Sequence, residues 1–170
     1  MKYDYKTLYE KNAAFLRAVP LRKRLIRILD VGVTVLFVFA YAYVLLHAWN
    51  TDVKTTDLVA LFFTPFLALF VASVLQIAID RPRPFAASGA NIEPLYTKRQ
   101  SGKSFPSRHL TCAFSIATVC LPYAPLFGGV LYVFAFLLAY ARFSLGWHYP
   151  SDLCGGAAIG TAIGCLIFVL

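Results

Sequence analysis

The sequence predicts an all-α fold: a polytopic membrane helical bundle of about five transmembrane helices with an N-terminal amphipathic helix in the interface. Of the 170 residues, 59% are hydrophobic and the mean hydropathy is +0.67, whereas soluble domains are roughly half apolar. Four stretches, at 31–51, 58–79, 110–141 and 153–170, contain no Asp, Glu, Lys or Arg. Because about 20 apolar residues cross a bilayer core, lipid is the expected solvent for much of the chain.

The N-terminal segment differs from the rest. Residues 3–18 mix charged and apolar side chains at helical spacing, and Pro20 is expected to end that helix. A basic cluster follows at 22–27. This pattern is typical of a helix that lies in the membrane interface beside a polybasic segment. We therefore divide the chain into an interfacial segment, 1–24, and a membrane domain, 25–170.

The first span is predicted over 25–49 and carries one acid, Asp30, just inside it. An acid at that depth needs a partner. We expect Arg27 or another interfacial arginine to pair with Asp30 in a structural role.

The second span is predicted over 57–79. It should end near Asp80, since Arg81 precedes Pro82 and a residue before proline avoids the helical region. The basic segment 80–106 is rich in Pro and Gly and is expected to form a polar loop.

The third apolar stretch, 110–141, is too long for one span and is interrupted by Pro and Gly at 122–129. It predicts two helices, 107–121 and 126–143, joined by a tight hairpin.

A last helix is predicted from Ser151 or Asp152 to the C-terminus. Gly156, Gly160 and Gly164 share one of its faces, where they let a neighbouring helix approach closely. The four cysteines, Cys112, Cys120, Cys154 and Cys165, have no zinc-site spacing and are expected to be packing residues.

Five spans place 80–106 and 143–152 on the side of the N-terminus. Of 16 Lys and Arg, only Lys54 falls on the opposite side. The positive-inside rule therefore predicts that the N-terminus and both segments face the cytoplasm. The net charge of +8 flanks apolar spans, which favours anionic headgroups and a phosphate-bearing substrate over nucleic acid as partners.

Three polar clusters should meet on that side: RPRP at 81–84, FPSRH at 105–109 and RFSLGWHYPSD at 142–152. A phosphoryl group in transfer spreads negative charge over its oxygens, and arginine offers planar paired donors to them. Ser107 begins a helix, where free backbone N–H groups bind anions. The candidate phosphate-binding arginines are Arg83 and Arg142 first, then Arg81 and Arg108.

Two histidines complete the cluster. His148 and Asp152 are four residues apart, and an aspartate beside a histidine fixes its tautomer and makes it a competent nucleophile or base. His109 can protonate a leaving group. The acids are too few and too scattered for a metal cage, so we expect no cofactor and a metal-independent reaction.

Each element also has a simpler explanation. Interfacial arginines often extend to lipid headgroups, RPRP could only stop a span, and loop histidines are usually solvated. The convergence of all three clusters on one face favours a site.

These motifs resemble the type 2 phosphatidic acid phosphatase superfamily, which shares its site with glucose-6-phosphatases and vanadium haloperoxidases. That pattern is Lys, six residues, Arg-Pro; then Pro-Ser-Gly-His; then Ser-Arg, five residues, His, three residues, Asp. The resemblance covers about 57–170. The matching residues are Arg83, Pro84, Pro106, Ser107, His109, Arg142, His148 and Asp152.

The resemblance implies that His148 is the nucleophile, that Asp152 orients it, and that His109 is the acid that later activates water. It also implies that the phosphate is held by Arg83, Ser107 and Arg142.

Three positions depart from the pattern: Gln76 replaces the lysine, Arg108 the glycine, and Ala141 the serine. Gln76 lacks the usual positive charge at the phosphate site, and our hypothesis is that Arg108 or Lys103 supplies it.

The predicted function is an integral membrane lipid phosphate or diphosphate phosphohydrolase acting through a phosphohistidine intermediate, in a bacterial plasma membrane. Candidate substrates are phosphatidate, phosphatidylglycerophosphate and polyprenyl phosphates or diphosphates. Two alternatives stay open: a lipid phosphotransferase with the same site, and a non-catalytic lipid-binding membrane protein. The long apolar spans argue against a haloperoxidase.

Overall fold

The fold of the chain is all-α, as predicted. The computed structural model describes residues 5–51, 53–88, 91–97 and 100–169, and no strand occurs among them. Its helices are α1 (Tyr5–Arg17), α2 (Pro20–Trp49), α3 (Thr55–Ile79), α4 (Arg108–Cys120), α5 (Pro125–Ser144), α6 (Pro150–Gly164) and the short 3-10 helix η1 (Cys165–Phe168).

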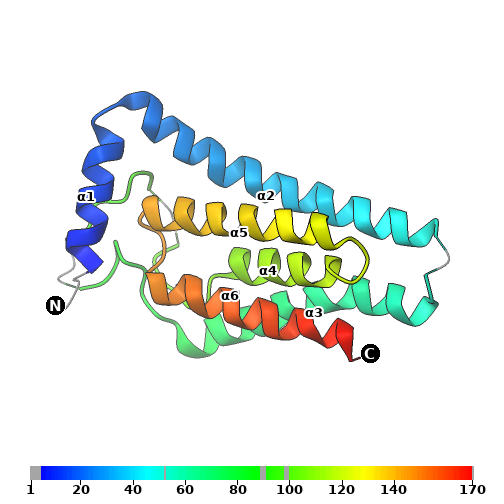
Figure 1. Cartoon of the computed structure of the whole chain (residues 1–170). Coiled ribbons are helices and arrows are strands. Elements are labelled where there is room, and N and C mark those ends of the chain that lie inside the picture. Colours follow the sequence, from blue (N-terminus) through cyan, green and yellow to red (C-terminus); the bar gives the residue numbers. More distant parts are fainter. Residues whose placement is uncertain (1–4, 52, 89–90, 98–99, 170) are drawn as a thin grey trace.

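Helices α2 to α6 run back and forth along one axis, and α1 lies across one end of the bundle (Figure 1). The loop between α3 and α4 and the short connection between α5 and α6 lie at that same end, while the C-terminus lies at the other. The predicted convergence of the polar segments is therefore confirmed.

Helix α4 differs from the expectation of five similar spans. Within the described part of the chain, four helical segments are long and apolar enough to cross a membrane, at Pro20–Trp49, Thr55–Ile79, Pro125–Ser144 and Pro150–Phe168. Helix α4 has only 13 residues. Every residue from Leu110 to Cys120 is buried except Cys112. A helix that is enclosed on every side needs no lipid-facing surface, so α4 is the short centre of the bundle.

Helix α2 begins earlier than the predicted first span. Pro20 occupies its first turn, where proline is favoured because the backbone N–H has no helical partner there. The basic cluster at 22–27 therefore belongs to α2, which runs across the proposed boundary between 1–24 and 25–170.

Helix α1 is packed onto the polar end. Its buried residues Tyr9 and Leu16 share an apolar cluster with Leu145 and Trp147. Gly146 adopts φ +75°, and a Cβ there would lie 2.8 Å from the Tyr9 hydroxyl. The turn between α5 and α6 therefore requires glycine twice over, for its backbone conformation and for contact with α1.

The predicted glycine face of α6 packs against α4. A Cβ on Gly156 would lie 2.8 Å from the Ser107 carbonyl oxygen, and one on Gly164 would lie 2.6 Å from the Thr118 Cβ. This close approach brings the N-termini of α4 and α6 together, and the Ser107 N–H donates to the Asp152 carbonyl oxygen at 3.0 Å.

Candidate active site

The loop between α3 and α4 folds back on itself at the polar end. Asp80 ends α3 in the left-handed conformation, with φ +39°. Two backbone hydrogen bonds then join the loop's limbs: Arg83 N–H to the Ser101 carbonyl at 2.8 Å, and Ser104 N–H to the Arg81 carbonyl at 2.9 Å. This fold places the RPRP segment beside the residues that precede α4.

His148 lies between these limbs and is only 2% exposed. Its Nε2 is 3.2 Å from Arg83 Nη1, and its Nδ1 is 2.9 Å from the Ser104 carbonyl oxygen. Because arginine only donates and a carbonyl only accepts, Nδ1 carries the proton and Nε2 presents its lone pair. Burial lowers the pKa of His148 to about 4, so the imidazole is neutral at physiological pH.

Asp152 is fully buried and accepts several hydrogen bonds. Its Oδ1 is 2.8 Å from Arg81 Nη1, and its Oδ2 accepts from the Tyr149 N–H at 2.9 Å and from the Ser104 hydroxyl. The His148 Nδ1 lies 3.6 Å from Oδ2. The nearest acceptor of the imidazole proton is therefore the Ser104 carbonyl. Asp152 keeps Ser104 in place by accepting a hydrogen bond from its hydroxyl.

Arg81 is engaged by the protein. Besides Asp152, it donates to the Ser151 hydroxyl at 2.8 Å and lies 4.1 Å over the Tyr149 ring. Its side chain is 36% exposed, which places it at the rim, where it neutralises the buried carboxylate.

Arg83 and Ser107 have unused hydrogen-bonding capacity. Arg83 is 2% exposed and donates to the Trp147 carbonyl at 2.9 Å, yet its Nε has no hydrogen-bond partner among the described residues. The buried hydroxyl of Ser107 has none in that part of the chain either. Burial, and then repulsion by Arg142, lowers the pKa of Arg83 to about 10, which leaves it charged at neutral pH. A buried cation and open donors suit an anion.

Arg142 and His109 line one cavity of ≈ 430 Å³ together with Trp147. Arg142 is buried near the end of α5, and its Nε is 2.6 Å from Oδ1 of Asp30. His109 is exposed in the first turn of α4. The expectation that an arginine pairs with Asp30 is confirmed, and Arg27 also lies 3.6 Å from it.

Gln76 is buried on α3, and its amide donates to the Pro106 carbonyl at 2.7 Å. The side chain thereby anchors the loop that leads into α4. Arg108 is half-buried, and its charge contributes to the lowered pKa of Arg83. Lys103 is half-buried with φ +59°. Of the two candidates for the missing charge, Arg108 therefore has the clearer electrostatic link to the site.

Sequence reasoning missed Ser104. It contributes its carbonyl to His148 and its hydroxyl to Asp152, but it stands outside the three motifs. A main-chain acceptor leaves no signature in the residue type, so no signal in the sequence pointed to it.

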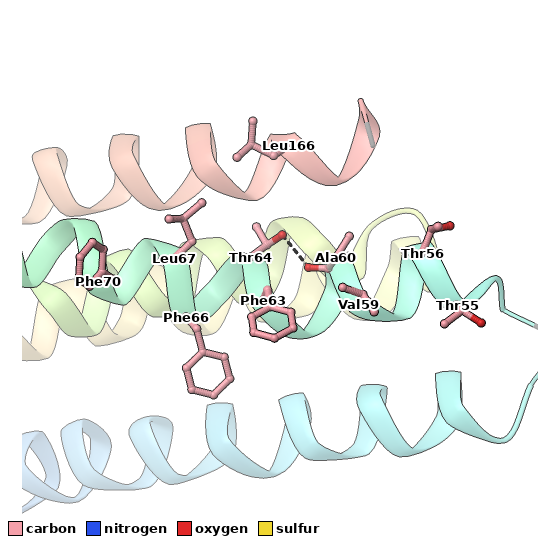
Figure 2. A pocket seen from close by; sticks show the side chains of 10 residues that line it. All are labelled: Thr55, Thr56, Val59, Ala60, Phe63, Thr64, Phe66, Leu67, Phe70 and Leu166. Carbon is pink, nitrogen blue, oxygen red and sulfur yellow. Dashed lines mark hydrogen bonds between the residues drawn. The ribbon is translucent and has the colours of Figure 1, made fainter.

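The cavities differ in the polarity of the side chains that line them. One cavity, ≈ 900 Å³, lies at the far end along α3 and η1 and is lined mainly by apolar side chains such as Phe63 and Leu67 (Figure 2). Another, ≈ 300 Å³, is lined by Arg108 and His109 at its polar end and by Leu138 in its apolar part. Thr34 and His109 line both this cavity and the cavity of ≈ 430 Å³ beside Arg142.

The chain is similar to known proteins. Residues 57–170 match the PAP2 superfamily. The chain is 30% identical over 141 residues to undecaprenyl-diphosphatase BcrC of Bacillus subtilis, covering 81% of this chain and 71% of that protein. It is 32% identical over 124 residues to the putative undecaprenyl-diphosphatase YbjG of Escherichia coli, covering 72% of this chain and 61% of that one.

A solved structure shares the fold. It is the crystal structure of the transmembrane PAP2-type phosphatidylglycerolphosphate phosphatase from Bacillus subtilis, with a TM-score of 0.67 at 20% identity. The match covers 96% of this chain and 85% of that one.

Proposed function

The chain belongs to the PAP2 superfamily, and from this premise we propose that it removes phosphate from a lipid phosphate or diphosphate through a phosphohistidine at His148. The family and the relatives make it an integral membrane lipid phosphatase of the PAP2 type. The observation that carries the proposal is the buried, neutral His148, whose Nε2 lone pair faces the charged Arg83.

In the first step, Nε2 of His148 attacks phosphorus, and the bond from phosphorus to the lipid oxygen breaks. The open donors of Arg83 and Ser107, with Arg142 and the backbone N–H groups at the start of α4, hold the non-bridging oxygens as their charge develops. His109 gives its proton to the leaving oxygen.

In the second step, the neutral His109 accepts a proton from water. The water oxygen attacks phosphorus, the P–N bond breaks, and inorganic phosphate leaves while His148 regains its lone pair. The imidazole is positively charged while it carries the phosphoryl group. The Ser104 carbonyl at Nδ1 and the carboxylate of Asp152 stabilise that charge.

The apolar part of the substrate has a matching space. The cavity of ≈ 300 Å³ starts at Arg108 and His109 and continues among Phe37, Tyr41 and Leu138. A lipid whose phosphate lies by His109 could place its first apolar segment there. We propose the predicted substrates, phosphatidate, phosphatidylglycerophosphate and polyprenyl phosphates or diphosphates, and rank polyprenyl diphosphate first because of BcrC and YbjG.

Phosphate release from these lipids by the protein in detergent, with EDTA present, tests the proposal. Release at a rate that depends on the lipid would support it and rank the substrates. Release that requires an added metal would contradict the expected metal-independent reaction. Loss of substrate without free phosphate would indicate transfer to another hydroxyl, and no reaction with any lipid would contradict the proposal.

The protonation of His148 gives a direct prediction. A histidine whose pKa is lowered stays neutral until the pH falls well below 6.5, the ordinary imidazole value. We expect the NMR signals of His148 to titrate near pH 4. The chain has three histidines, so comparison with His148→Gln assigns the signal. A midpoint at or above 6.5 would contradict the neutral nucleophile.

The charge that replaces the family's lysine is testable by substitution. If Arg108 or Lys103 supplies it, Arg108→Gln with Lys103→Gln should abolish the competitive inhibition of the phosphatase by inorganic phosphate. Each single change identifies which side chain acts, and we expect Arg108→Gln to have the larger effect because its charge reaches Arg83. Unchanged inhibition in the double variant would exclude both.

We propose that the site faces the cytoplasm of a bacterial plasma membrane, since eight of the 16 basic residues lie in 1–27. Ser88 is exposed in the loop between α3 and α4. In a variant with all four cysteines replaced, Ser88→Cys should react with an impermeant thiol reagent only after the cells are broken. Labelling in intact cells would place the site on the outer face.

A further inference from the structure

Asp30 is a buried acid within the first membrane span. It lies on α2 and is 3% exposed. It also lies outside residues 57–170, the segment that matches the family. An ionised carboxylate at this depth is costly unless it is paired, so the partners of Asp30 indicate its role.

The contacts of Asp30 lead to the phosphate site. Its Oδ1 is 2.6 Å from Nε of Arg142, which is 4% exposed, and its Oδ2 is 3.6 Å from Nη1 of Arg27. Both guanidinium groups lie against the Trp147 ring, at 5.4 Å and 5.1 Å from its centroid. These four side chains line the cavity of ≈ 430 Å³ that His109 also lines.

We propose that Asp30 is a positioning residue for Arg142: the ion pair at Nε holds the guanidinium where it can contact the substrate's phosphate. This inference rests on the function proposed above. Helix α2 then contributes Asp30 to the phosphate site, while residues 57–170, which match the family, contribute the reacting groups.

The physical reason is the geometry that phosphate recognition needs. Arginine binds phosphate with a planar fork, and a long side chain without a second contact does not keep that fork in place. Arg142 also repels Arg83, so the negative charge of Asp30 offsets the repulsion between two cations that share one anion. A displacement of about 1 Å of a positioned group can cost ~100-fold in rate.

A purely structural role is the competing explanation, in which Asp30 only neutralises a buried arginine. The two explanations differ in a double-mutant cycle. If Asp30 acts through Arg142, its loss has no further effect once Arg142 is gone. If the pair serves neutrality alone, removing both charges restores what either single change damages.

The experiment compares Asp30→Asn, Arg142→Gln and the double variant with wild type and with Asp57→Asn as a matched control. Asp57 lies in the first turn of α3, at the end of the bundle away from the site. The measurements are kcat and KM for the best lipid substrate, the binding of orthovanadate as a phosphate analogue, and the Tm in detergent.

We expect Asp30→Asn to lower kcat/KM about 100-fold and to weaken vanadate binding, while Asp57→Asn keeps wild-type values. The double variant should match Arg142→Gln in both measurements. Recovery of activity in the double variant, a further loss in it, or wild-type behaviour of Asp30→Asn would each contradict the inference.

Two features keep the outcome clear. If Asp30→Asn does not fold, the double variant, which buries neither charge, still gives the comparison with Arg142→Gln. If wild type releases no phosphate from any lipid, the proposed function fails, while vanadate binding by the same four variants decides the role of Asp30 separately.

Discussion

Replacing His148 by alanine is expected to lower phosphate release by at least about 10⁴-fold, because the reaction loses its covalent route. Both ring nitrogens of His148 are held, Nε2 by Arg83 at 3.2 Å and Nδ1 by the Ser104 carbonyl at 2.9 Å. No neighbouring side chain can take its place at Nε2, since Arg83 only donates. The measurement is phosphate release from the best lipid substrate under saturating conditions.

His47→Ala is the matched control. His47 is exposed near the end of α2, where its ring stacks on Tyr43, and its replacement should leave turnover unchanged. Vanadate binding should persist in His148→Ala, because Arg83 and Ser107 still offer their donors. An active His148→Ala variant would exclude His148 as the nucleophile.

Asp152→Asn is expected to reduce kcat by about 10³- to 10⁴-fold, in line with the loss seen when an aspartate that orients a catalytic histidine is made neutral. The carboxylate neutralises Arg81 and accepts from the Ser104 hydroxyl and the Tyr149 N–H. An amide cannot accept at all of these points. Ser104 should then shift, and its carbonyl should no longer hold Nδ1 of His148 in place.

A graded comparison separates these contributions. Ser104→Ala keeps the main-chain carbonyl and removes only the hydroxyl, so its expected loss is about tenfold, near the value of one hydrogen bond to a charged group. Asp57→Asn controls for loss of an acid elsewhere. Full activity in Asp152→Asn, or a larger loss in Ser104→Ala than in Asp152→Asn, would contradict the assigned roles.

The membrane helices could be predicted because hydrophobicity and charge determine them directly. The predicted spans 25–49, 57–79 and 126–143 correspond to Pro20–Trp49, Thr55–Ile79 and Pro125–Ser144. The central position and short length of α4 could not be predicted in the same way. An apolar stretch has the same sequence pattern whether lipid or other helices surround it. The close packing of Gly156 and Gly160 against α4 shows that helices surround this one.

The candidate site could be predicted in its members but not in its contacts. Spacing alone suggested a direct bond between Asp152 and His148, yet the Ser104 carbonyl is closer to the imidazole. An arginine partner for Asp30 could be predicted, but not that it is Arg142, which lies on a helix far along the chain. Such pairings depend on three-dimensional packing, because side chains brought together by different helices share no sequence spacing.

The phosphoenzyme itself is the most direct test of the central claim. The wild-type protein should be mixed with a lipid substrate labelled at its terminal phosphate, quenched in base within one turnover, and digested for peptide mapping. The account predicts a label that survives base, is lost in acid, and maps to His148. Turnover with no trapped label, or a label on any other residue, would contradict a phosphohistidine at this position.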